Sequence, residues 1–188
     1  MSKFNYAIKV PKERIGVLIG KNGEIKKKIE EETHIQIDVD SKEGEVRVSG
    51  EDALALFTSK NIIKAIARGY NPDIALTLLK QDYILELLEV SNYTKPSQID
   101  RVKGRVIGKD GKTRQLIEEL TETYISVYGK TIGIIGEVNN VTICKRAVES
   151  LLSGSTHAAV YKWLEKRRRK LKQESMEKFV EKNIINDI

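Results

Sequence analysis

The sequence predicts an α+β protein built from two copies of a βααββα module and a C-terminal helix. Three observations support this fold class. Residues 16–23 read GVLIGKNG and residues 104–111 read GRVIGKDG, an internal repeat at an offset of 88. Alternating apolar and polar segments, typical of half-buried strands, follow both copies in the same order. Each copy then ends in a long segment whose apolar residues have helical spacing.

Local patterns give the elements of the first copy. They are strand 4–10, a helix that starts at Pro11, a break at 20–23, helix 24–32, strands 35–39 and 45–49, and helix 51–70. Pro11 suits a first helical turn because the N–H that it lacks would have no partner there. Ile25 and Ile29 should face inward. The apolar stripe predicted for the last helix comprises Ala53, Leu56, Phe57, Ile63, Ile66 and Ala67.

The second copy repeats this order. Its elements are strand 83–90, a helix capped by Ser97, the loop 108–111, helix 112–120, strands 124–128 and 131–135, and helix 137–152. Val141, Cys144, Val148 and Leu151 share one face of the last helix, so we expect Cys144 in the core. Residues 122–127 match 32–37 at an offset of 90, which predicts two inserted residues before the strand. The following hairpin should be four residues shorter than in the first copy.

These patterns divide the chain into four parts. The first module covers residues 1–70 and is followed by a helical linker at 71–82. The second module covers residues 83–152. Residues 153–188 form a basic C-terminal part, in which 155–186 are expected to be one long helix. We expect one compact body with a pseudo-repeat.

The glycine loops carry the functional chemistry. A KH module clamps about four nucleotides between a Gly-x-x-Gly loop and a neighbouring strand. The glycines let the backbone approach phosphates, and the N-terminus of the next helix favours an anion. Lys21 and Lys109 add a positive charge inside each loop. Because both loops lie between two predicted helices of the same pattern, the sequence predicts two tandem type I KH domains.

Residues 104–120 (GRVIGKDGKTRQLIEEL) and 124–136 (YISVYGKTIGIIG) closely resemble the two-KH ribosome-assembly factors of the partner-of-Nob family, in an archaeal form. The specific match covers roughly residues 83–160. The first copy matches more loosely but has an intact loop at 20–23, whereas eukaryotic relatives have a degenerate first module. The resemblance implies binding near the 3′ end of the small-subunit rRNA precursor, beside the Nob endonuclease that matures that end. It also implies other small-subunit assembly or translation factors as partners and no catalysis by this chain.

Charge is distributed unevenly between the halves. The chain has a net charge of +6, but residues 1–90 contribute −1 and residues 91–188 contribute +7. Since affinity for RNA depends on cations near phosphates, the second loop should dominate. The predicted RNA-binding residues are Arg101, Lys103, Arg105, Gly108, Lys109, Asp110, Gly111, Lys112 and Arg114 around the second loop, and Gly20, Lys21, Asn22 and Gly23 in the first. By family analogy Ile125, with Val106 and Ile107, would form the floor of the base groove. Taken singly, each of these residues fits ordinary core better.

Composition argues against several other classes. One cysteine excludes an internal disulfide and suits a reducing cytoplasm. With two distant histidines it forms no recognisable zinc site, so no metal or cofactor is expected. No apolar run approaches the roughly 18 residues of a membrane span. Residues 108–113 (GKDGKT) look like a nucleotide-hydrolase phosphate loop, but Val106 stands where that motif needs glycine. No paired carboxylates accompany a histidine or a metal-type cluster, so we predict no enzyme.

Some alternatives stay open. The chain could be a general KH-type RNA-binding regulator or an RNA-decay adaptor. The first module could mainly dock a protein, because residues 1–90 have no net positive charge and Glu24, Glu30, Glu31 and Glu32 offset the lysines near its loop. The basic run 166–170 could extend the RNA track, contact an acidic partner or be a solvated helix face. The stripe of Met176, Phe179, Val180 and Ile184 could dock on the chain itself or bind a partner helix.

Overall fold

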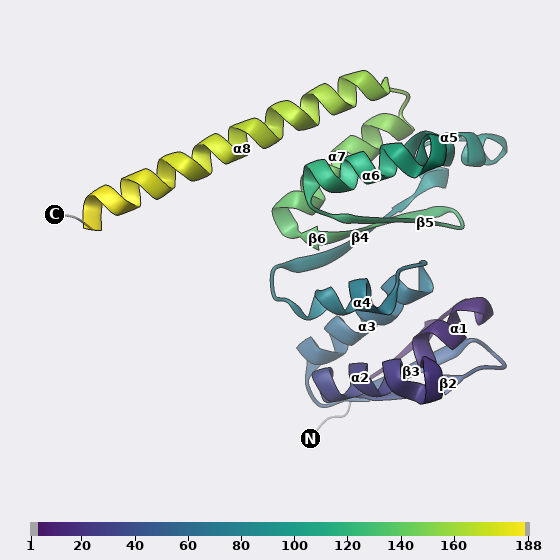
Figure 1. The fold of residues 1–188 in the computed structure, drawn as a ribbon. Helices are drawn as coiled ribbons and strands as arrows, with labels where there is room; N and C mark the ends of the chain where they lie inside the picture. Colours follow the sequence, from purple (N-terminus) through teal and green to yellow (C-terminus); the bar gives the residue numbers. More distant parts are fainter. Residues whose placement is uncertain (1–3, 187–188) are drawn as a thin grey trace.

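Two three-stranded antiparallel sheets organise the protein (Figure 1). The computed structural model describes residues 4–186, without the side chains of Ser175 and of residues 178–186. The first module comprises β1 (Phe4–Lys9), α1 (Lys12–Ile19), α2 (Glu24–Thr33), β2 (Gln36–Asp40), β3 (Glu45–Gly50) and α3 (Ala53–Ala67). The second comprises β4 (Tyr83–Glu89), α5 (Ile99–Ile107), α6 (Lys112–Thr121), β5 (Tyr124–Tyr128), β6 (Thr131–Glu137) and α7 (Val138–Leu152). The strand orders, β1-β3-β2 and β4-β6-β5, are equivalent, so the predicted fold class is confirmed.

The repeat is more regular than the sequence match suggested. Helices α2 and α6 both have 10 residues, and each ends at a left-handed residue, His34 or Glu122. Strands β2 and β5 therefore keep the offset of 88, and the predicted two-residue insertion is wrong. The equivalent threonines are Thr33 and Thr121, which each donate to the carbonyl four residues earlier. The hairpin pairs Asp40 with Glu45 and Tyr128 with Thr131, so the second turn is shorter by two residues rather than four.

The apolar face of α3 is shifted from the predicted stripe. Leu56, Ile63, Ile66 and Ala67 are buried, but Ala53 is exposed and Phe57 is 60% exposed. The helix begins at Ala53 because Asp52 accepts a hydrogen bond from Leu54 N at 2.8 Å. Its inward face then includes Ser59 and Ile62. Burial of Ser59 is tolerated because its hydroxyl donates to Ala55 O at 2.6 Å.

Two predictions about the second module had different outcomes. Cys144 is completely buried with Val141, Val148 and Leu151, as expected, and burial raises the pKa of its thiol to about 11. The predicted cap of α5 is wrong. Ser97 lies inside a 3-10 turn at Pro96–Gln98, and Gln98 precedes the helix without a side-chain capping bond.

The segment between the modules is helical and packs against both. It forms α4 (Pro72–Ala75) and a 3-10 turn at Leu76–Leu79. Figure 1 shows α4 between α3 and the second sheet, whose other face is covered by α5, α6 and α7. All of β6 from Thr131 to Gly136 is therefore buried. Ile135 belongs to the same core as Tyr70, Leu76 and Leu78.

Polar contacts fix this interface at Tyr70 and its neighbours. Tyr70 is 3% exposed, and its hydroxyl donates to Tyr124 O at 3.0 Å. Burial raises the pKa of that phenol far above its ordinary value. Ser126 Oγ donates to Arg68 O at 2.8 Å, and the Tyr128 hydroxyl donates to Glu13. Strand β5 is thus joined to the first module along its length.

The final helix, α8 (His157–Asn186), packs on the second module through its first turns, and its residues as far as Met176 line a surface groove beside α6 and α7. Val160 and Leu164 are buried, and the Tyr161 hydroxyl lies 2.9 Å from Thr113 Oγ1. The C-terminal part of the helix projects beyond the second module (Figure 1). Of the predicted apolar stripe, Met176 is 62% exposed, and the side chains of Phe179, Val180 and Ile184 lie outside the described residues. Among residues 4–186 no helix is both long and apolar enough to cross a membrane.

The tight contact between the modules gives a stability prediction. A Cβ at Gly133 in β6 would lie 2.8 Å from Tyr70 Cε2, inside a closed core. Gly133→Ala should therefore lower the free energy of unfolding by about 1–3 kcal/mol in urea titrations. Gly104→Ala is the matched control, because a Cβ in the middle of α5 meets nothing within 4 Å. It should stabilise the protein by about 0.5–1 kcal/mol. A Gly133→Ala protein as stable as the wild type would contradict the described contact.

Candidate nucleic-acid interface

The two glycine loops have the same backbone conformation. Gly108, Asp110 and Gly111 have φ angles of 72°, 54° and 76°, and their equivalents Gly20, Asn22 and Gly23 have 75°, 55° and 80°. Asn and Asp are the non-glycine residues that best tolerate the left-handed region, which explains the type of residue at 22 and 110. Each loop turns the chain sharply from one helix into the next.

The two glycines of the second loop have different roles. A Cβ at Gly108 would collide with Thr113 Oγ1 and lie 2.8 Å from Thr113 N, so this glycine lets the loop pack on the first turn of α6. A Cβ at Gly111 would meet nothing within 4 Å, although its φ still favours glycine. The backbone at Gly111 is therefore open to a group arriving from outside. That arrangement suits a phosphate.

The helix that follows each loop points its N-terminus at the open backbone. Gly23 and Gly111 precede α2 and α6, and neither helix has a side-chain cap on its first N–H groups. Such N–H groups and the helix dipole favour an anion. The first residue of the helix differs between the modules, because Glu24 begins α2 and Lys112 begins α6. The second site therefore favours an anion more strongly, even though Asp110 replaces the neutral Asn22.

A free strand edge forms the other wall of each site. Strands β2 and β5 lie at the edges of their sheets, next to α2 and α6. Lys103 Nζ donates to Gly129 O at 2.9 Å, which links α5 to the turn after β5. The side chains of Val106 and Ile125 are buried in the core, so they support the groove from behind. Ile107 is 37% exposed and can offer apolar surface.

Comparison with known proteins gives the family. The model of the second KH domain of PNO1 proteins, a eukaryotic-type KH domain (type I), matches residues 84–169, and the KH domain model matches residues 5–65. A KH domain-containing protein of Methanocaldococcus jannaschii is 44% identical over 96% of this chain and 82% of its own length. The crystal structure of Dim2p from Pyrococcus horikoshii has a TM-score of 0.82 and 42% identity, covering 87% of this chain and 99% of that one.

The chain belongs to the partner-of-Nob family of two-KH proteins. A P. horikoshii complex of a/eIF2alpha, Dim2p and rRNA contains a chain with a TM-score of 0.84 and 42% identity, covering 89% of this chain and 96% of that one. The pre-rRNA-processing protein PNO1 of Coccidioides immitis is 34% identical. The present chain covers 52% of that fungal protein and 48% of a Caenorhabditis elegans relative, so it spans about half of these eukaryotic proteins.

The cations that this partner-of-Nob protein places around its second loop fall into two groups. Within the described part of the chain, Arg101, Lys109 and Lys112 are exposed and form no ion pair. The other cations, Lys103, Arg105 and Arg114, have partners within the protein. Lys103 pairs with Asp100 at 2.8 Å and lowers the pKa of that carboxyl through its hydrogen bond. Arg114 Nε lies 3.8 Å from Glu118 Oε2.

Arg105 has a structural role that the sequence did not indicate. Its Nε donates to Leu151 O at 3.0 Å and its Nη2 to Ser155 O at 2.5 Å, so the guanidinium satisfies carbonyls at the end of α7. Arg14 does the same in the first module, donating to Ile66 O and Tyr70 O at the end of α3. The sequence shows only a basic residue on the helix before each loop, which does not distinguish this structural role from phosphate binding.

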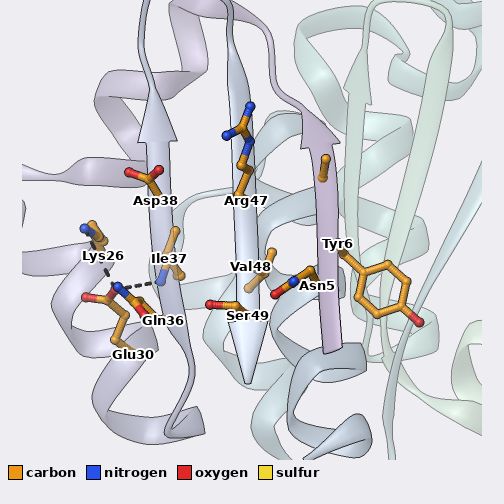
Figure 2. A pocket seen from close by; sticks show the side chains of 11 residues that line it. Asn5, Tyr6, Lys26, Glu30, Gln36, Ile37, Asp38, Arg47, Val48 and Ser49 are labelled. Carbon is orange, nitrogen blue, oxygen red and sulfur yellow. Dashed lines mark hydrogen bonds and ion pairs between the residues drawn. The ribbon is translucent and has the colours of Figure 1, made fainter. Parts of the chain in front are cut away.

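The first module also has a concave surface at its free edge. A cavity of about 580 Å³ lies beside α2, β2 and the outer face of the first sheet (Figure 2). Polar side chains cross this face in register, with Asn5 and Gln36 on either side of Ser49, and Arg47 beside Asp38. In the second module the equivalent face is covered by α4 and Tyr70. Among the described residues, no group of three or more His, Cys, Asp and Glu side chains could hold a metal.

The role of Arg105 can be separated from phosphate binding by a matched pair of variants. Arg105→Met removes a part-buried hydrogen bond to Leu151 O and an exposed one to Ser155 O, and should cost about 1–3 kcal/mol of unfolding free energy. It should leave the salt dependence of RNA affinity unchanged. Arg101→Met, on the exposed face of α5, should leave stability within about 0.5 kcal/mol of the wild type. If Arg105→Met is fully stable and weakens the salt dependence, Arg105 contacts phosphate instead.

Proposed function

We propose that this protein binds single-stranded RNA of the small-subunit rRNA precursor, near its 3′ end, and acts as an assembly and processing factor. The observation that carries the proposal is the open backbone at Gly111, at the N-terminus of a helix that begins with Lys112. The related Dim2p that was crystallised with rRNA supports the ribosomal target. The names of the fungal relatives support a role in pre-rRNA processing.

Within this proposal, the second module carries most of the affinity. RNA would lie with its phosphates on residues 108–112 and its bases between α6 and the edge of β5. The first module would bind RNA more weakly, because Glu24 opposes phosphate at the position of Lys112. The contacting residues proposed for the second loop are Gly108, Lys109, Asp110, Gly111, Lys112 and Arg101, with Gly20, Lys21, Asn22 and Gly23 in a secondary site.

The same proposal includes partners and a place of action. The Nob endonuclease would supply the cleavage at the 3′ end, and this chain would present the RNA without catalysing a reaction itself. A translation factor related to a/eIF2alpha is a second proposed partner, since that protein is part of the P. horikoshii complex. A cytoplasmic location fits a chain with one buried cysteine and an rRNA target.

Charge reversal at equivalent lysines tests which loop dominates. Lys109→Asp keeps both glycines and places uncompensated negative charge where a phosphate must lie. It should weaken binding of a single-stranded oligomer at least tenfold, since the loss of about 1.4 kcal/mol is enough. The slope of log affinity against log salt should fall by about 0.7, the value for one neutralised phosphate on a single strand. Fluorescence anisotropy at several salt concentrations measures both quantities.

Lys21→Asp is the matched variant, because it makes the same charge change in the same loop conformation. It should cost less affinity than Lys109→Asp. Thermal unfolding of both variants must match the wild type, since a destabilised fold would imitate lost binding. The proposal fails if the folded Lys21→Asp protein loses more affinity, or if a matched blunt duplex binds as tightly as the single strand.

A further inference from the structure

A glutamate on the helix after each loop bonds the free edge of the neighbouring strand. Glu118 Oε1 on α6 accepts from Ile125 N in β5 at 2.7 Å. Glu30 Oε1 on α2 accepts from Ile37 N in β2, also at 2.7 Å, as Figure 2 shows. Both pairs occupy equivalent positions of the repeat. One N–H of each edge strand, which could otherwise donate to a base, is therefore already bonded.

This bond changes what the groove offers to a ligand. An ionised carboxylate only accepts hydrogen bonds, so the wall at this point presents an acceptor in place of the backbone donor. Within residues 4–186 the second oxygen of Glu118 accepts no hydrogen bond, although it forms a long ion pair with Arg114. Its nearest cation, Arg114 Nε, is 3.8 Å away, too far for a hydrogen bond, and this buried Nε has no hydrogen-bond partner within residues 4–186.

Both carboxylates can be reached from outside. The Glu118 side chain is 24% exposed and lines a surface cavity of about 380 Å³ next to Tyr124. The Glu30 side chain is also 24% exposed and lines the cavity of about 580 Å³ described above. Backbone hydrogen bonding holds one oxygen of each carboxylate in place. The other oxygen is thereby oriented before any ligand arrives.

We propose that Glu118 selects the base read by the second module, favouring cytosine and adenine over uracil; this inference rests on the proposed RNA-binding function. Cytosine N4 and adenine N6 are amino groups that can donate to the free carboxylate oxygen, and such charge-assisted bonds are strong. Uracil presents the O4 carbonyl at that position. Two acceptors would then face each other, and each would lose its bond to water without gaining a partner.

The test compares single-stranded octamers of cytidine, adenosine and uridine by fluorescence anisotropy at one salt concentration. The wild type should bind the cytidine and adenosine octamers about tenfold more tightly than the uridine octamer, a difference of about 1.4 kcal/mol. Glu118→Gln keeps an oxygen for Ile125 N but adds an N–H₂ donor that can bond uracil O4. Its preference should shrink to about threefold or less, mainly because the uridine octamer binds more tightly.

Glu137→Gln is the control, since it removes the same charge from an exposed position of the second module that, unlike Glu119, does not line the cavity beside Glu118. Any general gain in affinity for phosphates should appear in both variants, whereas only Glu118→Gln should change the preference. A second arm needs no variant: a cytidine octamer without the 4-amino groups should bind the wild type as weakly as the uridine octamer. The inference is overturned if the octamer without amino groups binds as tightly as the cytidine octamer. It is also overturned if both variants show the same preference between the cytidine and uridine octamers. Absence of binding to every single strand would instead overturn the proposed function.

Discussion

The rest of the structure depends on the burial of the second sheet on both faces. Strand β6 is covered by its own helices on one side and by Tyr70, α4 and the turn at Leu76–Leu79 on the other. Gly133 is needed because the Tyr70 ring lies where a side chain would be. The same interface fixes β5 through Tyr124 and Ser126. The first module therefore positions the strand edge that forms one wall of the proposed RNA groove in the second module.

The two modules share a loop conformation but differ in what surrounds it. The loops share their backbone angles, so the geometry for phosphate binding is present twice. The surroundings differ, because Glu24 stands where Lys112 stands in the second module. The outer face of the first sheet is polar and open, whereas the matching face of the second sheet is apolar and covered. We infer that the first module mainly supports the second, and that its own groove is a weaker site.

Sequence patterns predicted the parts of the molecule that depend on local interactions. The order of the elements, the glycine loops and the burial of Cys144 follow from periodicity and backbone conformation. The errors arose where distant contacts decide. Phe57 was placed in the core because the spacing of α3 alone cannot fix which face is covered. The structural role of Arg105 was not predicted, because its bonds to Leu151 and Ser155 join residues about 50 positions apart, and its contact with RNA stays a prediction. The hydrogen bond that Ile125 N donates to Glu118 could not be predicted until the edge strand was known.

The central claim is that RNA lies between the second glycine loop and the edge of β5. Hydrogen–deuterium exchange with mass spectrometry tests it directly, on the full chain with and without a single-stranded oligomer of cytidine and adenosine. RNA should slow exchange most strongly in peptides that cover residues 104–114 and 124–130, where free N–H groups would become bonded or shielded. Peptides from residues 16–40 should change less. Protection confined to residues 16–40, with none between 104 and 130, would contradict the account.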